Sequence, residues 1–62
     1  MTIQELREIS RGISDSKYTE MCREHPKRFE FVDFEFEAYG DRVYLLDKVT
    51  GEYFSTFRSC GD

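Results

Sequence analysis

The sequence predicts an α+β fold in which two short N-terminal helices pack on one face of a three-stranded antiparallel β-meander. Three observations lead to this prediction. Helix-capping patterns and apolar residues at helical spacing occupy the first 26 residues, the apolar period changes to two after residue 28, and two glycines divide the remainder into three short segments. A chain of 62 residues can build only one small core, so we expect residues 1–62 to form a single small domain.

The first helix is expected near residues 3–11. Thr2 is followed three residues later by Glu5, a capping-box pattern in which each side chain bonds a free backbone N–H at the helix start. Gly12 suits the left-handed conformation in which many helices end. Between these signals, apolar residues recur at helical spacing: Ile3, Leu6 and Ile9.

A second helix is expected near residues 15–24. Ser14 can cap its start, and Pro26 ends it because a proline disfavours helical geometry in the residue before it. Its apolar side is short and consists of Tyr18, Met21 and Cys22. The two helices would form an αα-hairpin over residues 1–26, joined by a tight turn.

The first strand of the meander, which covers residues 28–58, is expected near residues 29–38. Alternating side chains of a strand point to opposite faces, and here one face is apolar and the other acidic. The apolar face contains Val32, Phe34, Phe36 and Ala38. The acidic face contains Asp33, Glu35 and Glu37. We therefore expect the helices to cover the apolar face and the carboxylates to point away from it.

The loop after this strand is expected at Gly40-Asp41, because glycine suits the first position of a two-residue II′ hairpin loop. The second strand then covers about residues 42–47, with Ala38 opposite Val43. In this register the acidic face of the first strand lies beside two outward-pointing residues of the second strand, Tyr44 and Leu46.

The third strand is expected near residues 53–58, after a turn that contains Gly51 in the left-handed conformation. If Asp47 lies opposite Tyr53, Phe54 joins the outer, acidic face. The inner face, covered by the helices, then contains Val32, Phe34, Phe36, Leu45 and Phe57. Residues 59–62 are expected to form a loose tail.

Charge is distributed unevenly along the chain. Residues 1–28 hold six Lys or Arg and five Asp or Glu, whereas residues 29–62 hold three and eight, for a net charge of −4. The acidic second half disfavours direct contact with a phosphate backbone and favours a partner with a basic surface.

Cysteine content and hydropathy indicate a cytoplasmic protein. The chain has two cysteines, far fewer than a disulfide-stapled secreted domain, and no apolar run that could act as a signal peptide or span a bilayer. We therefore expect reduced thiols and no membrane partner.

The outer face of the predicted sheet is the candidate partner-binding site. It combines a row of carboxylates with neighbouring aromatic and aliphatic side chains: Asp33, Glu35, Glu37, Tyr44, Leu46 and Phe54. Carboxylates that alternate along a strand repel one another, and aromatic anchors often dominate protein interfaces. An alternative interpretation is that the charges only deter pairing with other strands.

These features predict a small acidic regulator or inhibitor that docks this face on a basic surface of a partner protein. One such partner is a nucleic-acid-processing protein, in whose groove the carboxylates would take the place of nucleic acid. In size and acidity the chain resembles the small regulators made by phages and mobile elements. We expect no direct contact with nucleic acid, and the small core is compatible with self-association.

The competing interpretation is a nucleic-acid-binding regulator that uses the N-terminal helices as a helix-turn-helix-like pair. The second helix and its end carry four basic residues: Lys17, Arg23, Lys27 and Arg28. A DNA-binding domain of this kind usually has a net basic charge and a third helix. This chain is acidic overall, and its sequence predicts only two helices. We therefore favour a helical pair that covers the sheet.

A metal site, a cofactor and catalysis are all disfavoured. Cys22 and His25 have the spacing of metal ligands, and Cys60 could add a thiolate, but a structural zinc site needs a fourth ligand that only a carboxylate such as Asp62 could supply. His25 is the only histidine, and the chain has no nucleophile motif or phosphate-binding glycine loop. We expect a protein that is not an enzyme.

Overall fold

The computed structural model describes residues 2–59. Its elements, in order, are α1 (Ile3–Ile9), β1 (Arg11–Ile13), α2 (Asp15–Glu24), β2 (Phe29–Glu37), β3 (Gly40–Asp47) and β4 (Tyr53–Ser59). The strands form one mixed sheet in the order β1-β4-β3-β2, in which β2, β3 and β4 make an antiparallel meander and β1 pairs in parallel with β4. The predicted α+β fold with its meander is confirmed, and β1 is a fourth strand that the sequence analysis did not predict.

Side-chain caps fix where both helices begin. The Thr2 hydroxyl accepts a hydrogen bond from the Glu5 N–H (3.2 Å), and the Glu5 carboxylate accepts one from the Thr2 N–H (3.0 Å), so the predicted capping box is present. The bond from the Thr2 N–H lowers the pKa of Glu5. At α2, the Ser14 hydroxyl accepts a hydrogen bond from the Lys17 N–H (3.1 Å), which confirms the second predicted start.

The first helix ends earlier than predicted. It stops at Ile9 because Ser10 is already extended (φ −77°, ψ 139°) and the next three residues pair with β4. Gly12 therefore lies in a strand opposite Ser55 and does not end the helix in a left-handed conformation. Among the described residues only Gly51 has a positive φ (80°), as predicted for the second turn. Pairing with the sheet gives these backbone groups the partners that another helical turn would have supplied.

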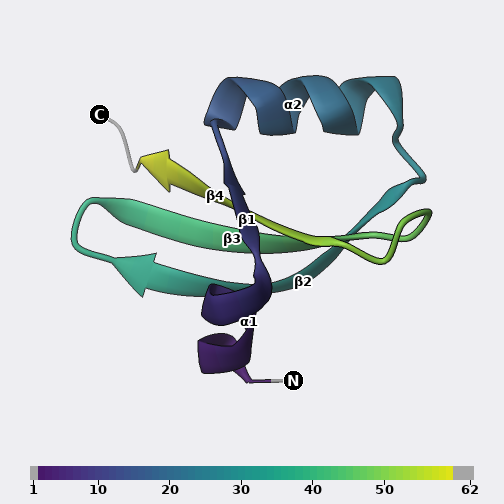
Figure 1. The fold of residues 1–62 in the computed structure, drawn as a ribbon. Coiled ribbons are helices and arrows are strands. Elements are labelled where there is room, and N and C mark those ends of the chain that lie inside the picture. Colours follow the sequence, from purple (N-terminus) through teal and green to yellow (C-terminus); the bar gives the residue numbers. More distant parts are fainter. Residues whose placement is uncertain (1, 60–62) are drawn as a thin grey trace.

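The two helices lie on opposite sides of the sheet (Figure 1). β1 separates them along the chain and forms one edge of the sheet, so the chain crosses from one side to the other at that edge. The prediction of an αα-hairpin packed on one face is therefore wrong. A strand of three residues is too short to produce a recognisable alternating pattern, and the turn-like Gly12 concealed it.

Side-chain alternation assigns each strand residue to one of two faces, which we call the α1 side and the α2 side. Glu35 reaches Arg7 of α1, and the residues that share its face are Asp33, Glu37, Tyr44, Leu46 and Phe57. Arg58 pairs with Asp15 of α2 (3.4 Å) and lies over the Tyr18 ring. The residues that share the face of Arg58 are Phe34, Phe36, Val43, Leu45 and Phe54.

The β2–β3 hairpin turns two residues earlier than predicted. Glu37 lies opposite Gly40, so the loop is Ala38-Tyr39, and the expected loop at Gly40-Asp41 is wrong. Gly40 is buried in β3, where an added Cβ would lie 2.8 Å from the Ser59 Cα and would also meet a backbone carbonyl of β4. Close packing between strands, rather than turn conformation, therefore requires this glycine.

The β3–β4 register is offset by one residue from the prediction. Leu46, rather than Asp47, lies opposite Tyr53. Because successive side chains of a strand point to opposite faces, this offset reverses the orientation of β4. Phe54 therefore lies on the α2 side and Phe57 on the α1 side, the reverse of their predicted positions.

The side chain of Asp47 explains this offset. Its carboxylate accepts a hydrogen bond from the Val49 N–H (2.9 Å), and its backbone N–H donates to the Glu52 carbonyl (2.8 Å), which fixes how the turn closes. Arg28 donates two hydrogen bonds to the same carboxylate (3.0 and 2.9 Å). Asp47 is buried, and the Arg28 guanidinium holds its pKa well below the usual value.

The core is small and divided between the two sides of the sheet. Leu6 of α1 and Tyr44 of β3 are fully buried, and Leu45 and Thr56 are buried on the α2 side. α2 itself has no fully buried residue. Ser59 belongs to β4, and the rest of the predicted tail lies outside the described residues. No helix within residues 2–59 is long and apolar enough to cross a membrane.

The close packing at Gly40 predicts a large effect of one added methyl group. Gly40→Ala should lower the free energy of unfolding by about 1–3 kcal/mol, because the backbone of β4 cannot move aside as a side chain can. Gly12→Ala is the matched control: no atom lies within 4 Å of its added Cβ, and the change should be neutral or stabilise by up to about 1 kcal/mol. Urea denaturation measures both, and equal effects would contradict the tight β3–β4 contact.

The Arg28–Asp47 pair predicts a loss of stability in acid. The folded pKa of Asp47 lies below its unfolded value, so its contribution is present above about pH 4 and is lost as the pH falls further. The urea midpoint should therefore fall between about pH 5 and pH 2, and Asp47→Asn should make that fall shallower. Asp41→Asn, on the same strand but away from this turn, should keep the wild-type slope. An unchanged slope in Asp47→Asn would contradict the assigned pair.

Candidate functional site

The predicted binding residue Tyr44 is part of the core rather than an exposed anchor. Its ring is fully buried on the α1 side, and its hydroxyl donates a hydrogen bond to Glu35 (2.9 Å). Arg7 of α1 also pairs with the Glu35 carboxylate, through its Nε (3.1 Å) and a terminal nitrogen. Glu35 thus connects the helix to two strands, and it serves the fold of its own chain.

The other predicted site residues are separated in the structure. Glu37 pairs with Arg42 (2.8 Å), and Asp33 accepts a hydrogen bond from the Phe34 N–H (2.8 Å). Leu46 is half-buried on the α1 side, whereas Phe54 lies on the opposite side. The expectation of uncompensated carboxylates beside exposed aromatic rings on one face is therefore wrong. Arginines from α1 and β3, which the sequence pattern did not place there, neutralise two of the three carboxylates.

Exposed aromatic side chains lie instead on the α2 side of β2. Phe31, Phe34 and Phe36 are 57%, 43% and 78% exposed, although two of them were expected to be core residues. The rings touch in sequence, with centroids 6.2 Å apart between Phe31 and Phe34 and 5.1 Å apart between Phe34 and Phe36. We call these three residues the open aromatic row.

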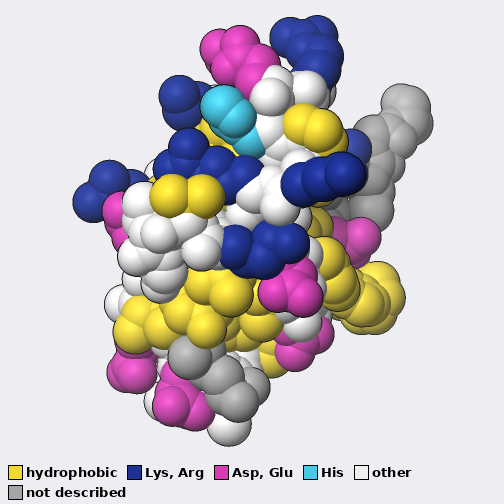
Figure 2. Space-filling view, turned by 90° about the vertical axis from the view of Figure 1, so that its right-hand side faces the viewer, with side chains coloured by type: hydrophobic (Ala, Val, Ile, Leu, Met, Phe, Trp, Pro, Cys, Tyr) yellow, Lys and Arg dark blue, Asp and Glu magenta, His cyan; other side chains and the backbone are white. Residues whose placement is uncertain are grey.

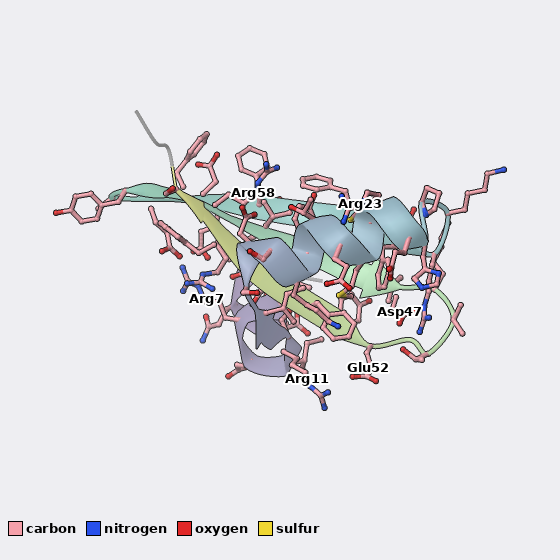
Figure 3. The ribbon with its side chains drawn as sticks, turned by 90° about the horizontal axis from the view of Figure 1, so that it is seen from above. Arg7, Arg11, Arg23, Asp47, Glu52 and Arg58 are labelled. Atoms are coloured by element: carbon pink, nitrogen blue, oxygen red, sulfur yellow. The ribbon has the colours of Figure 1, made fainter. Side chains whose placement is uncertain are left out.

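The open aromatic row is exposed because α2, a helix of ten residues, packs over β4 and does not extend over this part of β2. Seen from above, the helix crosses the β4 part of the sheet, and the β2–β3 hairpin extends beyond it (Figure 3). The same hairpin projects past both helices in the side view (Figure 1). Near α2, Phe29 packs edge-on against Phe54 (6.3 Å), so the first phenylalanine of β2 is covered and the next three are not.

A β-bulge brings Phe31 into line with the other two rings. Phe31 lies opposite Leu45, but Asp33 lies opposite Tyr44, so Val32 is the extra residue in the register. Without the bulge, strict alternation would place Phe31 and Phe34 on opposite faces. In the sequence of β2, phenylalanines are two residues apart except between Phe31 and Phe34, which are three apart. This change of spacing is the sequence feature that could have indicated both the bulge and the open aromatic row.

The hairpin that carries the open aromatic row is strongly acidic. Residues 29–47 include six Asp or Glu and one Arg. Figure 2 shows the contrast on one face of the molecule: Lys and Arg side chains gather in the upper part, over α2, and Asp and Glu side chains lie mostly in the lower part, among hydrophobic ones. The exposed rings thus belong to a hairpin whose sequence is acidic, although Asp33, Glu35 and Glu37 lie on its other face.

The remaining candidate features are a cavity beside α2 and the predicted zinc ligands. A cavity of about 280 Å³ between α2 and the sheet is lined by Arg28 and Asp47, whose charges already bond each other, and by Phe29 and Phe54. Within residues 2–59, no three His, Cys, Asp or Glu side chains lie close enough together to hold a metal ion. The proposed third zinc ligand Cys60 lies outside the described residues.

The arrangement behind the helix-turn-helix interpretation is also absent from the described part of the chain. The two N-terminal helices are separated by β1 and lie on opposite sides of the sheet, and Arg28 is engaged by Asp47. Comparison with known protein families, curated proteins and solved structures finds no match to this chain. The open aromatic row and the acidic hairpin around it are therefore the features from which function is argued.

Proposed function

We propose that this protein is a small acidic binding module that regulates or inhibits a partner protein by occupying a basic, partly apolar surface of it. The open aromatic row supplies the contact, and the acidic β2–β3 hairpin supplies the charge that selects the partner. The proposal keeps the function expected from the sequence and moves its contact surface to the opposite side of the sheet.

The observation that carries the proposal is the exposure of three adjoining phenylalanine rings in a chain with a very small core. Complete burial of one phenylalanine side chain contributes about 1.5–3 kcal/mol, so the partial exposure of Phe31, Phe34 and Phe36 leaves some of this stabilisation unused. Contiguous exposed apolar patches mark interaction sites, and aromatic residues dominate interface energetics. A partner would bury the rings that α2 leaves uncovered.

Charge supports a basic partner. Residues 29–47 carry six acidic residues and one basic residue, a net charge of −5, and the pairs with Arg7 and Arg28 offset two of these charges, so the hairpin region remains acidic. An acidic surface steers a basic partner and repels acidic ones, so charge should govern the association rate and its dependence on salt. The aromatic contacts should govern the lifetime of the complex.

Regulation through binding alone is consistent with the chemistry of the described residues. The pKa shifts of Glu5, Arg28 and Asp47 all arise from hydrogen bonds that hold helix starts and turns. Because Glu35 and Glu37 are paired with arginines of the same chain, we do not extend the proposal to imitation of a phosphate backbone.

The proposal predicts that removing the aromatic rings abolishes partner retention without unfolding the protein. A Phe34→Ser/Phe36→Ser bait should lose a protein from the source cells that the wild type retains, because both rings lie outside the core. Val49→Ser is the matched control, since Val49 is 72% exposed but lies in the β3–β4 turn away from the hairpin. Calorimetry with the purified partner should show at least about a tenfold weaker affinity for the double variant only.

Circular dichroism of each bait establishes that it is folded. Equal retention of the partner by the wild type and the folded double variant would contradict the proposed function. Loss of the partner from the Val49→Ser bait but not from the double variant would also contradict it.

A further inference from the structure

We propose, on the basis of the function proposed above, that the partner binds as an extended segment that adds an antiparallel strand to the outer edge of β2. The segment would alternate apolar with Lys or Arg side chains. Strand addition would give the partner a defined binding mode and a defined sequence pattern.

The outer edge of β2 is the long open edge of the sheet. β2 is the terminal strand of the order β1-β4-β3-β2 and has nine residues, whereas the strand at the other edge has three. Neither helix lies along β2 over the length of the hairpin (Figure 3). An edge of this length offers backbone N–H and C=O groups to another strand, which is the basis of strand-addition recognition.

The backbone of the phenylalanines, rather than that of the acidic residues, faces this edge. The Phe34 N–H donates a hydrogen bond to the Asp33 carboxylate (2.8 Å) and so does not bond to β3. In an antiparallel ladder the bonding direction alternates, so Phe36 faces outward like Phe34. Before the bulge, the Lys48 N–H donates a hydrogen bond to the Arg28 carbonyl (2.9 Å), so the backbone of Arg28 faces β3. By the same alternation, the backbone N–H and C=O groups of Phe29 and Phe31 face the outer edge.

This orientation defines the pattern of the added strand. In an antiparallel pair, the residues opposite outward-facing ones exchange both backbone hydrogen bonds and place their side chains on the same face. At Phe34 the added strand would replace Asp33 as the acceptor of the N–H. Partner residues opposite Phe34 and Phe36 would therefore lie on the α2 side, beside exposed rings, and should be apolar. The alternate residues would lie on the α1 side beside Glu30 and Asp33, which form no ion pair within residues 2–59, and beside Glu35 and Glu37, which are already paired with arginines. The unpaired carboxylates favour Lys or Arg at these alternate positions.

Charge argues against a second copy of the chain as the added strand. Pairing of two β2 edges would bring two acidic rows together, and like charges on adjacent strands are destabilising. The same carboxylates attract a basic strand, so the edge discriminates by charge.

A set of blocked peptides, each about seven residues long, tests the inference with the intact protein. The probe alternates lysine and valine, and the charge control alternates glutamate and valine. Two further probes carry N-methyl groups, one on the valines, whose N–H groups would pair with β2, and one on the lysines, whose N–H groups would point away. Affinity is measured by calorimetry, and amide exchange is followed at Phe34 and Phe36.

The lysine peptide should bind at least about tenfold more tightly than the glutamate peptide, and N-methylation of the valines should weaken it by a similar factor. N-methylation of the lysines should have little effect, and bound peptide should slow exchange of the Phe34 and Phe36 amides. Equal loss with both methylated peptides, no loss with either, or no binding of the lysine peptide would overturn strand addition. None of these results touches the partner-retention test, which depends only on the aromatic rings.

The same experiments address the competing occupant. A concentration-dependent dimer in sedimentation, abolished by Phe36→Ser, would identify a second copy as the occupant and overturn the inference. A monomer at all concentrations, together with the peptide results above, would support it.

Discussion

The hydrogen-bonded group of Arg7, Glu35 and Tyr44 fixes which face of this sheet α1 covers. Tyr44 is the largest fully buried side chain, and its hydroxyl and the α1 guanidinium share one carboxylate of β2. This arrangement commits α1 to the acidic face of the meander. α2, which reaches the other face through β1, is left to cover that face alone and covers only part of it.

The placement of α1 on the acidic face explains why a strand rich in carboxylates is compatible with this fold. Three acidic residues of the hairpin's α1 side have structural partners: Asp33 caps a backbone N–H, Glu35 holds α1, and Glu37 pairs with Arg42. The phenylalanines of the same strand face the other way and find no helix over them beyond Phe29. The fold therefore uses the polar residues of β2 internally and presents its apolar residues, a reversal of the usual arrangement in a half-buried strand.

Sequence reasoning identified what local chemistry decides and failed where tertiary packing decides. The capping box at Thr2, the Ser14 cap and the left-handed Gly51 follow from single residues and their near neighbours, and all are present. The α+β fold and the meander follow from the change of period. Gly40, in contrast, is read as a turn residue although β4 requires it, and the β4 register depends on how one carboxylate, Asp47, closes a turn. The binding residues were misplaced for the same reason: no pattern in the sequence reveals which face a helix will cover.

The orientation of the sheet is the claim on which the account depends, and nuclear Overhauser contacts test it most directly. The Tyr44 ring protons should show contacts with α1 side chains, including Arg7, whereas the Phe34 and Phe36 rings should show contacts with each other and none with α1. Contacts from Phe34 or Phe36 to α1, together with a solvent-exposed Tyr44 ring, would place the aromatic row in the core and contradict both the fold described and the function proposed from it.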